Sequence, residues 1–128
     1  MAPIACQTLH DHLTDLKRTP DYYDVIITGD LGKTGSKIFT KLIKDEYNYK
    51  IKNYLDASSI IYEGVDSTFQ GGSGPTVLPL VFFNKIIPEK KYKKILLLAT
   101  GSLHNPMMVN LKKSIPSITH AISIEVIE

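Results

Sequence analysis

Residues 24–32 read DVIITGDLG, and this stretch decides the fold. Its residues 25–28 form a short apolar, β-branched run, which is typical of a strand that is buried on both faces. Gly29 ends the run and opens a small polar turn over 29–32. A strand that is covered on both faces requires helices on each side of its sheet, so the stretch predicts an α/β layer structure.

A second stretch, ILLLATGS at 95–102, has the same organisation, with a strand expected over 95–100 that stops at Thr100-Gly101. Strands and helices alternate around these two segments, which predicts an α/β fold with a mixed, mostly parallel sheet and helices on both faces. The other expected elements are a helix over 4–16, a helix capped by Ser36 with the apolar stripe Ile38, Leu42 and Ile43, a short strand or pocket-lining segment over 59–62, a helix over 75–87 that Pro88 ends, a long connection over 101–117 and a closing strand over 121–127.

Composition limits the classes of protein to consider. With 128 residues, 43% of them hydrophobic and 22% charged, the chain is expected to form one domain over 1–128. A net charge of +2 is too small to predict nucleic-acid binding. Cys6 is the one cysteine, so no intramolecular disulfide is possible and a reducing compartment is expected. No apolar run reaches the roughly 18 residues of a membrane span, and the first residues do not resemble a secretory signal. We expect a soluble, cytosolic domain.

Three turns are the candidate ligand site. Two follow the predicted strands, and the third, QGGSG at 70–74, precedes the helix that contains Pro75. Ligands of open α/β sheets sit at the carboxyl ends of the parallel strands, and the first N–H groups of a helix can bind an anion. We therefore expect one shared pocket, although each glycine by itself would also be explained by a tight turn. The candidate ligand-binding residues are Gly29, Asp30, Gly72, Ser73, Thr100, Gly101 and Ser102.

The sequence predicts no catalytic residue, metal ligand or cofactor. GDLGKTG at 29–35 is not a phosphate-binding P-loop, because position 27, where that motif has a glycine, is isoleucine. The histidines are not adjacent to a nucleophile, and Ser73 and Ser102 lack the flanking residues of a nucleophile elbow. Cys6 is expected to be a small core residue.

Taken in order, four segments resemble the C-terminal half of the stage V sporulation protein AD (SpoVAD) family, over residues 1–125. They are DYYDVIITGDLGKTG at 21–35, QGGSG at 70–74, YKKILLLATGSLHNP at 92–106 and SIPSITHAISIE at 114–125. The family is similar in fold to thiolases and ketoacyl synthases, in which two related halves pack into a five-layer αβαβα sandwich. The resemblance implies a single half-domain of this thiolase-like fold.

The resemblance also implies a non-enzymatic sporulation protein that contributes to dipicolinic acid binding and uptake into the developing spore. Dipicolinate, with or without calcium, is the implied ligand. The chain departs from thiolase-type enzymes because it lacks their nucleophilic cysteine, has no histidine at 28–30, and has Pro75 where a cysteine usually follows GGSG. Two alternatives stay open: an acyl-transferase remnant whose partner chain supplies the cysteine, and a purely structural subunit.

The segment 75–87 is apolar nearly all round and is expected to be buried on several sides. A half-domain would leave part of it exposed, so the expected partner is a second copy or a separately encoded N-terminal thiolase-like half. A truncated remnant is the alternative. The resemblance further implies association with other SpoVA operon proteins, no nucleic acid, and a cytoplasmic or forespore location with at most peripheral association with the spore inner membrane.

Overall fold

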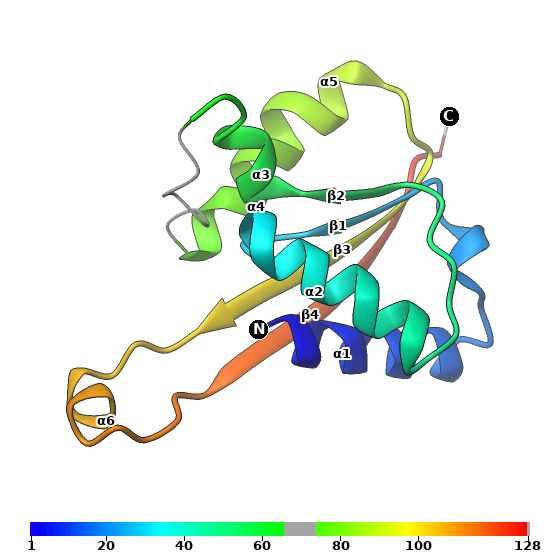
Figure 1. Cartoon of the computed structure of the whole chain (residues 1–128). Helices are drawn as coiled ribbons and strands as arrows, with labels where there is room; N and C mark the ends of the chain where they lie inside the picture. Colours follow the sequence, from blue (N-terminus) through cyan, green and yellow to red (C-terminus); the bar gives the residue numbers. More distant parts are fainter. Residues whose placement is uncertain (66–73, 128) are drawn as a thin grey trace.

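The computed structural model of the chain describes residues 1–65 and 74–127, which form an α/β structure around one four-stranded sheet (Figure 1). The strands are β1 (Val25–Thr28), β2 (Tyr54–Asp56), β3 (Lys94–Ser102) and β4 (Ser117–Glu125), in the order β2-β1-β3-β4. β1 pairs in parallel with both β2 and β3, whereas β4 pairs antiparallel to β3. The prediction of an α/β fold with a mostly parallel sheet is confirmed.

Helices α1 (Ala2–Asp15) and α2 (Gly32–Asp45) pack on one face of the sheet. Their buried side chains, which include Leu9 and Phe39, contact Ile26 of β1 and Leu96 of β3. The lysines of α2 point outward and are exposed. The first helix and the burial of Cys6 within it agree with the sequence expectations.

A continuous helical segment over residues 74–89 covers the other face. It consists of a 3-10 turn, η2 (Gly74–Thr76), followed by α4 (Val77–Val81), a π-helical stretch labelled η3 (Phe82–Ile86) and α5 (Ile87–Glu89). Its buried residues contact Val25, Ile27, Ile95 and Leu97 of the two central strands. Alternate residues of β1 therefore enter two different cores, which explains why all four of its residues are buried.

Several local expectations are wrong. Ser36 lies inside α2 rather than at its cap, because α2 begins at Gly32. Ile38 is exposed, and Phe39 takes its place in the core. Residues 59–62 are not a strand, because α3 (Ala57–Ile61) occupies most of this range and the strand is β2; the alternative, a pocket-lining segment, agrees with Ser59 and Ile60, which line a pocket beside β2. Pro88 does not end the helical segment, which continues to Glu89.

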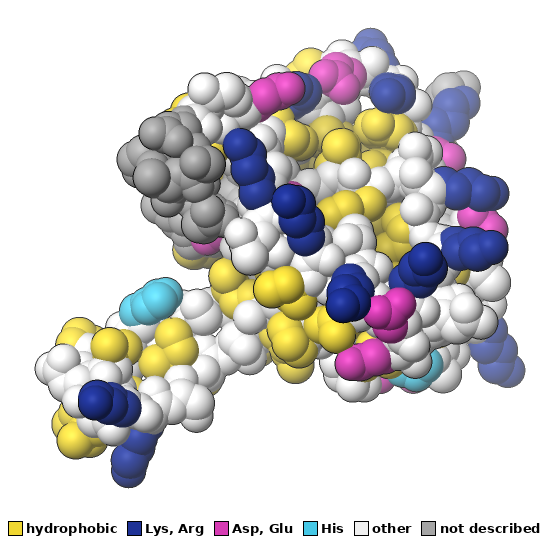
Figure 2. Space-filling model, in the orientation of Figure 1, with side chains coloured by type: hydrophobic (Ala, Val, Ile, Leu, Met, Phe, Trp, Pro, Cys, Tyr) yellow, Lys and Arg dark blue, Asp and Glu magenta, His cyan; other side chains and the backbone are white. Residues whose placement is uncertain are grey.

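Strands β3 and β4 extend beyond the rest of the sheet as a two-stranded arm (Figure 1). β3 does not stop at Thr100-Gly101 as expected but continues to Ser102, and β4 begins at Ser117. The short helix α6 (Pro106–Asn110) lies between them at the tip. Figure 2 shows hydrophobic side chains gathered over this tip, where Leu103, Met107 and Leu111 are largely exposed.

Candidate functional site

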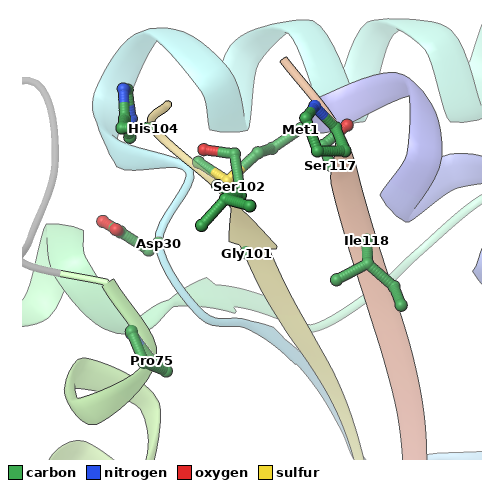
Figure 3. A pocket seen from close by; sticks show the side chains of 10 residues that line it. Met1, Asp30, Pro75, Gly101, Ser102, His104, Ser117 and Ile118 are labelled. Carbon is green, nitrogen blue, oxygen red and sulfur yellow. The ribbon is translucent and has the colours of Figure 1, made fainter. Parts of the chain in front are cut away.

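A cleft of about 770 Å³ lies where β1 and β3 end and the arm begins. Three of the predicted residues line it: Asp30 from the turn after β1, and Gly101 and Ser102 from β3. Asp30 and Pro75 lie on one side, Ser117 and Ile118 of β4 lie on the other, and Gly101 and Ser102 lie between them (Figure 3). The complete lining is Met1, Asp30, Pro75, Gly101, Ser102, Leu103, His104, Pro116, Ser117 and Ile118.

Two further predicted residues, Gly29 and Thr100, line a smaller neighbouring pocket of about 180 Å³. Thr100 is buried, and its Oγ1 accepts a hydrogen bond from the backbone N–H of Asp30 at 2.9 Å. A Cβ at Gly29 would lie 3.2 Å from this same Thr100 Oγ1. Thr100 and Gly29 thus hold the turn after β1 against β3, and so fix where Asp30 enters the larger cleft.

The remaining predicted residues, Gly72 and Ser73, lie outside the described residues. Pro75, which follows the glycine-rich sequence QGGSG, lines both the larger cleft and the smaller pocket.

The sequence interpretation missed Asp56, whose buried carboxylate organises the turn after β1. Its two oxygens accept hydrogen bonds from the backbone N–H groups of Leu31 and Gly32, each at 3.0 Å. Asp56 also accepts from the Thr28 hydroxyl at 2.7 Å and the Ser58 hydroxyl at 2.6 Å. A carboxylate from β2 therefore binds the first N–H groups of α2, a stabilising arrangement because those groups have no partner within the helix.

Asp56 also caps its own helix, α3, by accepting from the backbone N–H of Ser59 at 3.1 Å. Asp56 followed by Ser58 and Ser59 is a pattern that favours a helix N-terminus, and this local signal could have identified the cap. Ser58 makes a further contact to the turn after β1, since its backbone N–H donates to the Gly29 carbonyl oxygen at 3.2 Å. Gly32 has a φ of 67°, a left-handed conformation that glycine adopts without strain.

The larger cleft combines apolar walls with few charged groups. Leu103 and Ile118 on the arm and Pro75 supply the apolar surface, whereas Asp30 and His104 supply the ionisable side chains. Within residues 1–65 and 74–127, no group of three or more His, Cys, Asp or Glu side chains is placed to hold a metal ion.

Cys6 is unsuited to nucleophilic chemistry. Its side chain is buried in the core below α2, with its Sγ 3.6 Å from the carbonyl oxygen of Phe39. Burial, assisted by the negative charge of Glu46, raises the pKa of the Cys6 thiol to about 11. The thiol is therefore neutral at physiological pH, and the thiolate is the reactive form.

Among the helices that the structure describes, none has the length and apolar character needed to cross a membrane.

Comparison with known proteins adds a family match. The sequence model described as Stage V sporulation protein AD (SpoVAD) matches residues 1–125. The chain is also similar to stage V sporulation protein AD of Bacillus subtilis (strain 168), with 36% identity over 128 residues. This alignment covers 98% of the chain but 38% of the Bacillus subtilis protein, so the chain spans well under half the length of this relative.

Proposed function

The chain belongs to the SpoVAD family of sporulation proteins, and from this premise we propose that it binds dipicolinic acid together with calcium and contributes to dipicolinate uptake into the developing spore. The proposal includes a forespore location, peripheral to the spore inner membrane. One observation carries it: the acidic residue Asp30 and the small residues Gly101 and Ser102 line the same cleft at the ends of β1 and β3.

The shape and polarity of the cleft suit a small aromatic ligand. Ile118 provides apolar surface on one side for a flat ring, and Pro75 provides it on the other (Figure 3). Leu103 and Pro116 add apolar surface to the lining. The Ser102 hydroxyl can donate a hydrogen bond to a carboxylate. A volume of about 770 Å³ is within the range that small-molecule sites occupy.

Asp30 determines the form in which dipicolinate binds. Dipicolinate is a dianion, so its carboxylates and the Asp30 carboxylate repel each other unless a cation lies between them. Calcium prefers oxygen ligands and takes six to eight of them. The two carboxylates and the ring nitrogen of dipicolinate supply three ligands to calcium, Asp30 adds another, and water molecules complete the set. We therefore propose that the ligand is the calcium complex rather than free dipicolinate.

Isothermal titration calorimetry tests this proposal. Dipicolinate is titrated into the folded chain with calcium and, separately, with a chelator in place of calcium. Isophthalate, which has the same two carboxylates but lacks the ring nitrogen, is the matched control ligand. We expect heat of binding from dipicolinate with calcium, and at least tenfold weaker binding in each of the other two titrations.

Two substitutions locate the binding. Asp30→Asn removes the charge that contacts calcium and should weaken binding at least tenfold, whereas Glu63→Gln, near a separate pocket beside β2, should leave it unchanged. Absence of binding heat by the folded chain under every condition contradicts the proposal. Equal binding by wild type and Asp30→Asn contradicts the assigned site.

A further inference from the structure

The tip of the arm, residues 103–116, carries an exposed apolar surface. Its exposed hydrophobic side chains are Leu103, Met107, Met108, Val109 and Leu111. Four of the five have exposed fractions between 53% and 65%. A single exposed apolar side chain is ordinary on a protein surface, whereas a group of them at the end of a protruding arm indicates contact with another apolar phase or molecule (Figure 1).

The charged side chains of the tip are all basic. Lys112 and Lys113 follow directly after the apolar residues, and both are exposed. Residues 103–116 contain no Asp or Glu. Figure 2 shows basic side chains beside the hydrophobic ones on the tip. An apolar surface that is flanked by lysines and free of acidic residues is complementary to a lipid bilayer with anionic headgroups.

The backbone of the tip forms its own hydrogen bonds. The Asn105 side chain accepts from the backbone N–H groups of Met107 at 3.0 Å and Met108 at 3.4 Å, which caps α6. The N–H of Leu111 donates to the Met107 carbonyl at 3.0 Å, and that of Lys113 donates to the Met108 carbonyl at 2.9 Å. Because an unpaired backbone group is costly in an apolar phase, these internal bonds allow the tip to enter the interface of a bilayer.

We propose that the tip of the arm is a membrane-contact element, which inserts its apolar side chains into the interface of an anionic bilayer. Lys112 and Lys113 then lie at the level of the headgroups, where they attract the lipid phosphates. The inference rests on the peripheral membrane location proposed above. It names the part of the chain that makes the contact and the class of lipid that this part selects.

A second pair of exposed lysines lies at the other end of β3. Lys90 and Lys91 precede this strand, whereas the tip follows it. β3 has nine residues, so its ends are about 30 Å apart. Charges are screened over about 8 Å at physiological ionic strength. A membrane that contacts the tip therefore attracts Lys112 and Lys113 but not Lys90 and Lys91.

Membrane contact at the tip has a consequence for the larger cleft. The cleft lies at the base of the arm, and three residues of its lining, Leu103, His104 and Pro116, belong to the tip. A tip that is seated in a bilayer therefore brings the cleft to the headgroup surface. This position suits a site that receives or delivers a ligand at a membrane.

Cosedimentation with vesicles tests the inference. The folded chain is mixed, at physiological salt, with vesicles of phosphatidylcholine alone or of phosphatidylcholine and phosphatidylglycerol. Each lysine near an anionic surface contributes about fivefold to binding, so we expect roughly 25-fold stronger binding to the vesicles that contain phosphatidylglycerol. The double variant Lys112→Gln with Lys113→Gln should lose this preference.

The double variant Lys90→Gln with Lys91→Gln is the matched control. It removes the same charge, and each pair includes one residue with a left-handed φ, 50° at Lys90 and 54° at Lys112. Because Lys90 and Lys91 lie beyond the reach of the membrane charge, this variant should bind within about twofold of wild type.

Tryptophan fluorescence separates insertion from adsorption to the surface. The chain has no tryptophan, so Leu111→Trp introduces a single probe at the tip. Phe83→Trp places the probe at an exposed position of helical segment 74–89 as the control. Anionic vesicles should shift the emission of Leu111→Trp to the blue, and lipids with brominated acyl chains should quench it, whereas Phe83→Trp should not respond. Leu111→Asp should weaken vesicle binding at least about tenfold, because the burial of a leucine side chain is lost.

None of the substituted residues lines the larger cleft, so calorimetry with dipicolinate should give the same result for wild type and every variant. Failure of vesicle binding is thereby distinguished from failure of ligand binding. The inference is overturned if wild type does not bind anionic vesicles, binds both kinds of vesicle equally, or associates through the tip with another polypeptide without binding lipid. It is also overturned if the two double variants lose binding equally, or if the probe at position 111 stays exposed to water.

Discussion

Replacing Asp56 with asparagine tests how the candidate site is built. The Asp56 carboxylate is buried, and its Oδ2 accepts hydrogen bonds from the backbone N–H of Gly32 at 3.0 Å and of Ser59 at 3.1 Å. Asparagine fills the same volume and leaves one carbonyl oxygen, which can continue to accept from Thr28 and Leu31. Its amide NH₂ takes the place of Oδ2 and is a donor only.

The expected loss of unfolding free energy in Asp56→Asn follows from the groups that lose a hydrogen-bond acceptor. The hydroxyl of Ser58 can rotate to accept from the new amide, whereas a backbone N–H cannot reverse its direction. The Ser59 N–H loses its acceptor, and the Gly32 N–H keeps only its contact to the Ser58 Oγ at 3.0 Å. A buried donor without a partner costs about 1–3 kcal/mol, and the Ser59 N–H is the group left without one, so Asp56→Asn should lower the free energy of unfolding by about 1–3 kcal/mol.

Urea unfolding followed by circular dichroism measures this difference. Asp45→Asn, an exposed position near the end of α2, is the matched control and should change the unfolding free energy by less than about 0.5 kcal/mol. A loss of less than about 1 kcal/mol in Asp56→Asn would refute the view that this carboxylate holds the turn after β1 in place.

Three further predictions concern single residues. Gly32→Ala should lower the unfolding free energy by about 1–2 kcal/mol, because the left-handed φ of 67° is unfavourable for alanine. Gly101→Ala is the control and should change the unfolding free energy little, because a Cβ at this position meets nothing within 4 Å. Equal losses in the two variants on urea unfolding would contradict this. The pKa of Asp24 is lowered by hydrogen bonds from the backbone N–H groups of Lys94 and Lys93. The stability that this carboxylate contributes is therefore present above pH about 4, near its pKa in the unfolded chain, and is lost as the pH falls through its lower pKa in the folded chain. Asp24→Asn should therefore destabilise the chain at pH 7 but hardly at pH 2, and an equal loss at both pH values would be inconsistent with this sign. Burial raises the pKa of Cys6 to about 11, so the stability that this shift contributes is complete below pH about 8.5 and declines as the pH rises toward 11. The native thiol should not react with an aromatic disulfide reagent at pH 8 until urea unfolds the chain, and rapid labelling of the native chain would contradict its burial.

The central part of the fold was predictable because its signals are local. The apolar runs at 25–28 and 95–98 are buried on both faces, as their composition requires. Asp30, Gly101 and Ser102 come together because they follow or end neighbouring parallel strands, whose carboxyl ends lie at one edge of the sheet.

Other elements depend on contacts between distant segments. β2 has three residues in a polar, aromatic stretch, and it forms a strand because it pairs with β1 rather than through propensity of its own. α2 begins at Gly32, before the expected cap, because Asp56 from that distant strand binds its first N–H groups. The arm was expected as an irregular connection, since pairing between residues such as Gly101 and Ile118 has no signature in either segment alone.

The most direct test of the central claim is a two-dimensional ¹H–¹⁵N NMR titration of the folded chain with dipicolinate and calcium. If the cleft at the ends of β1 and β3 is the binding site, the amide signals of Asp30, Gly101, Ser102 and His104 should shift in a saturable manner. The signals of Glu63 and Tyr92, which line the separate pocket beside β2, should stay in place. Saturable shifts confined to that separate pocket, or no shifts at millimolar ligand, would contradict the account.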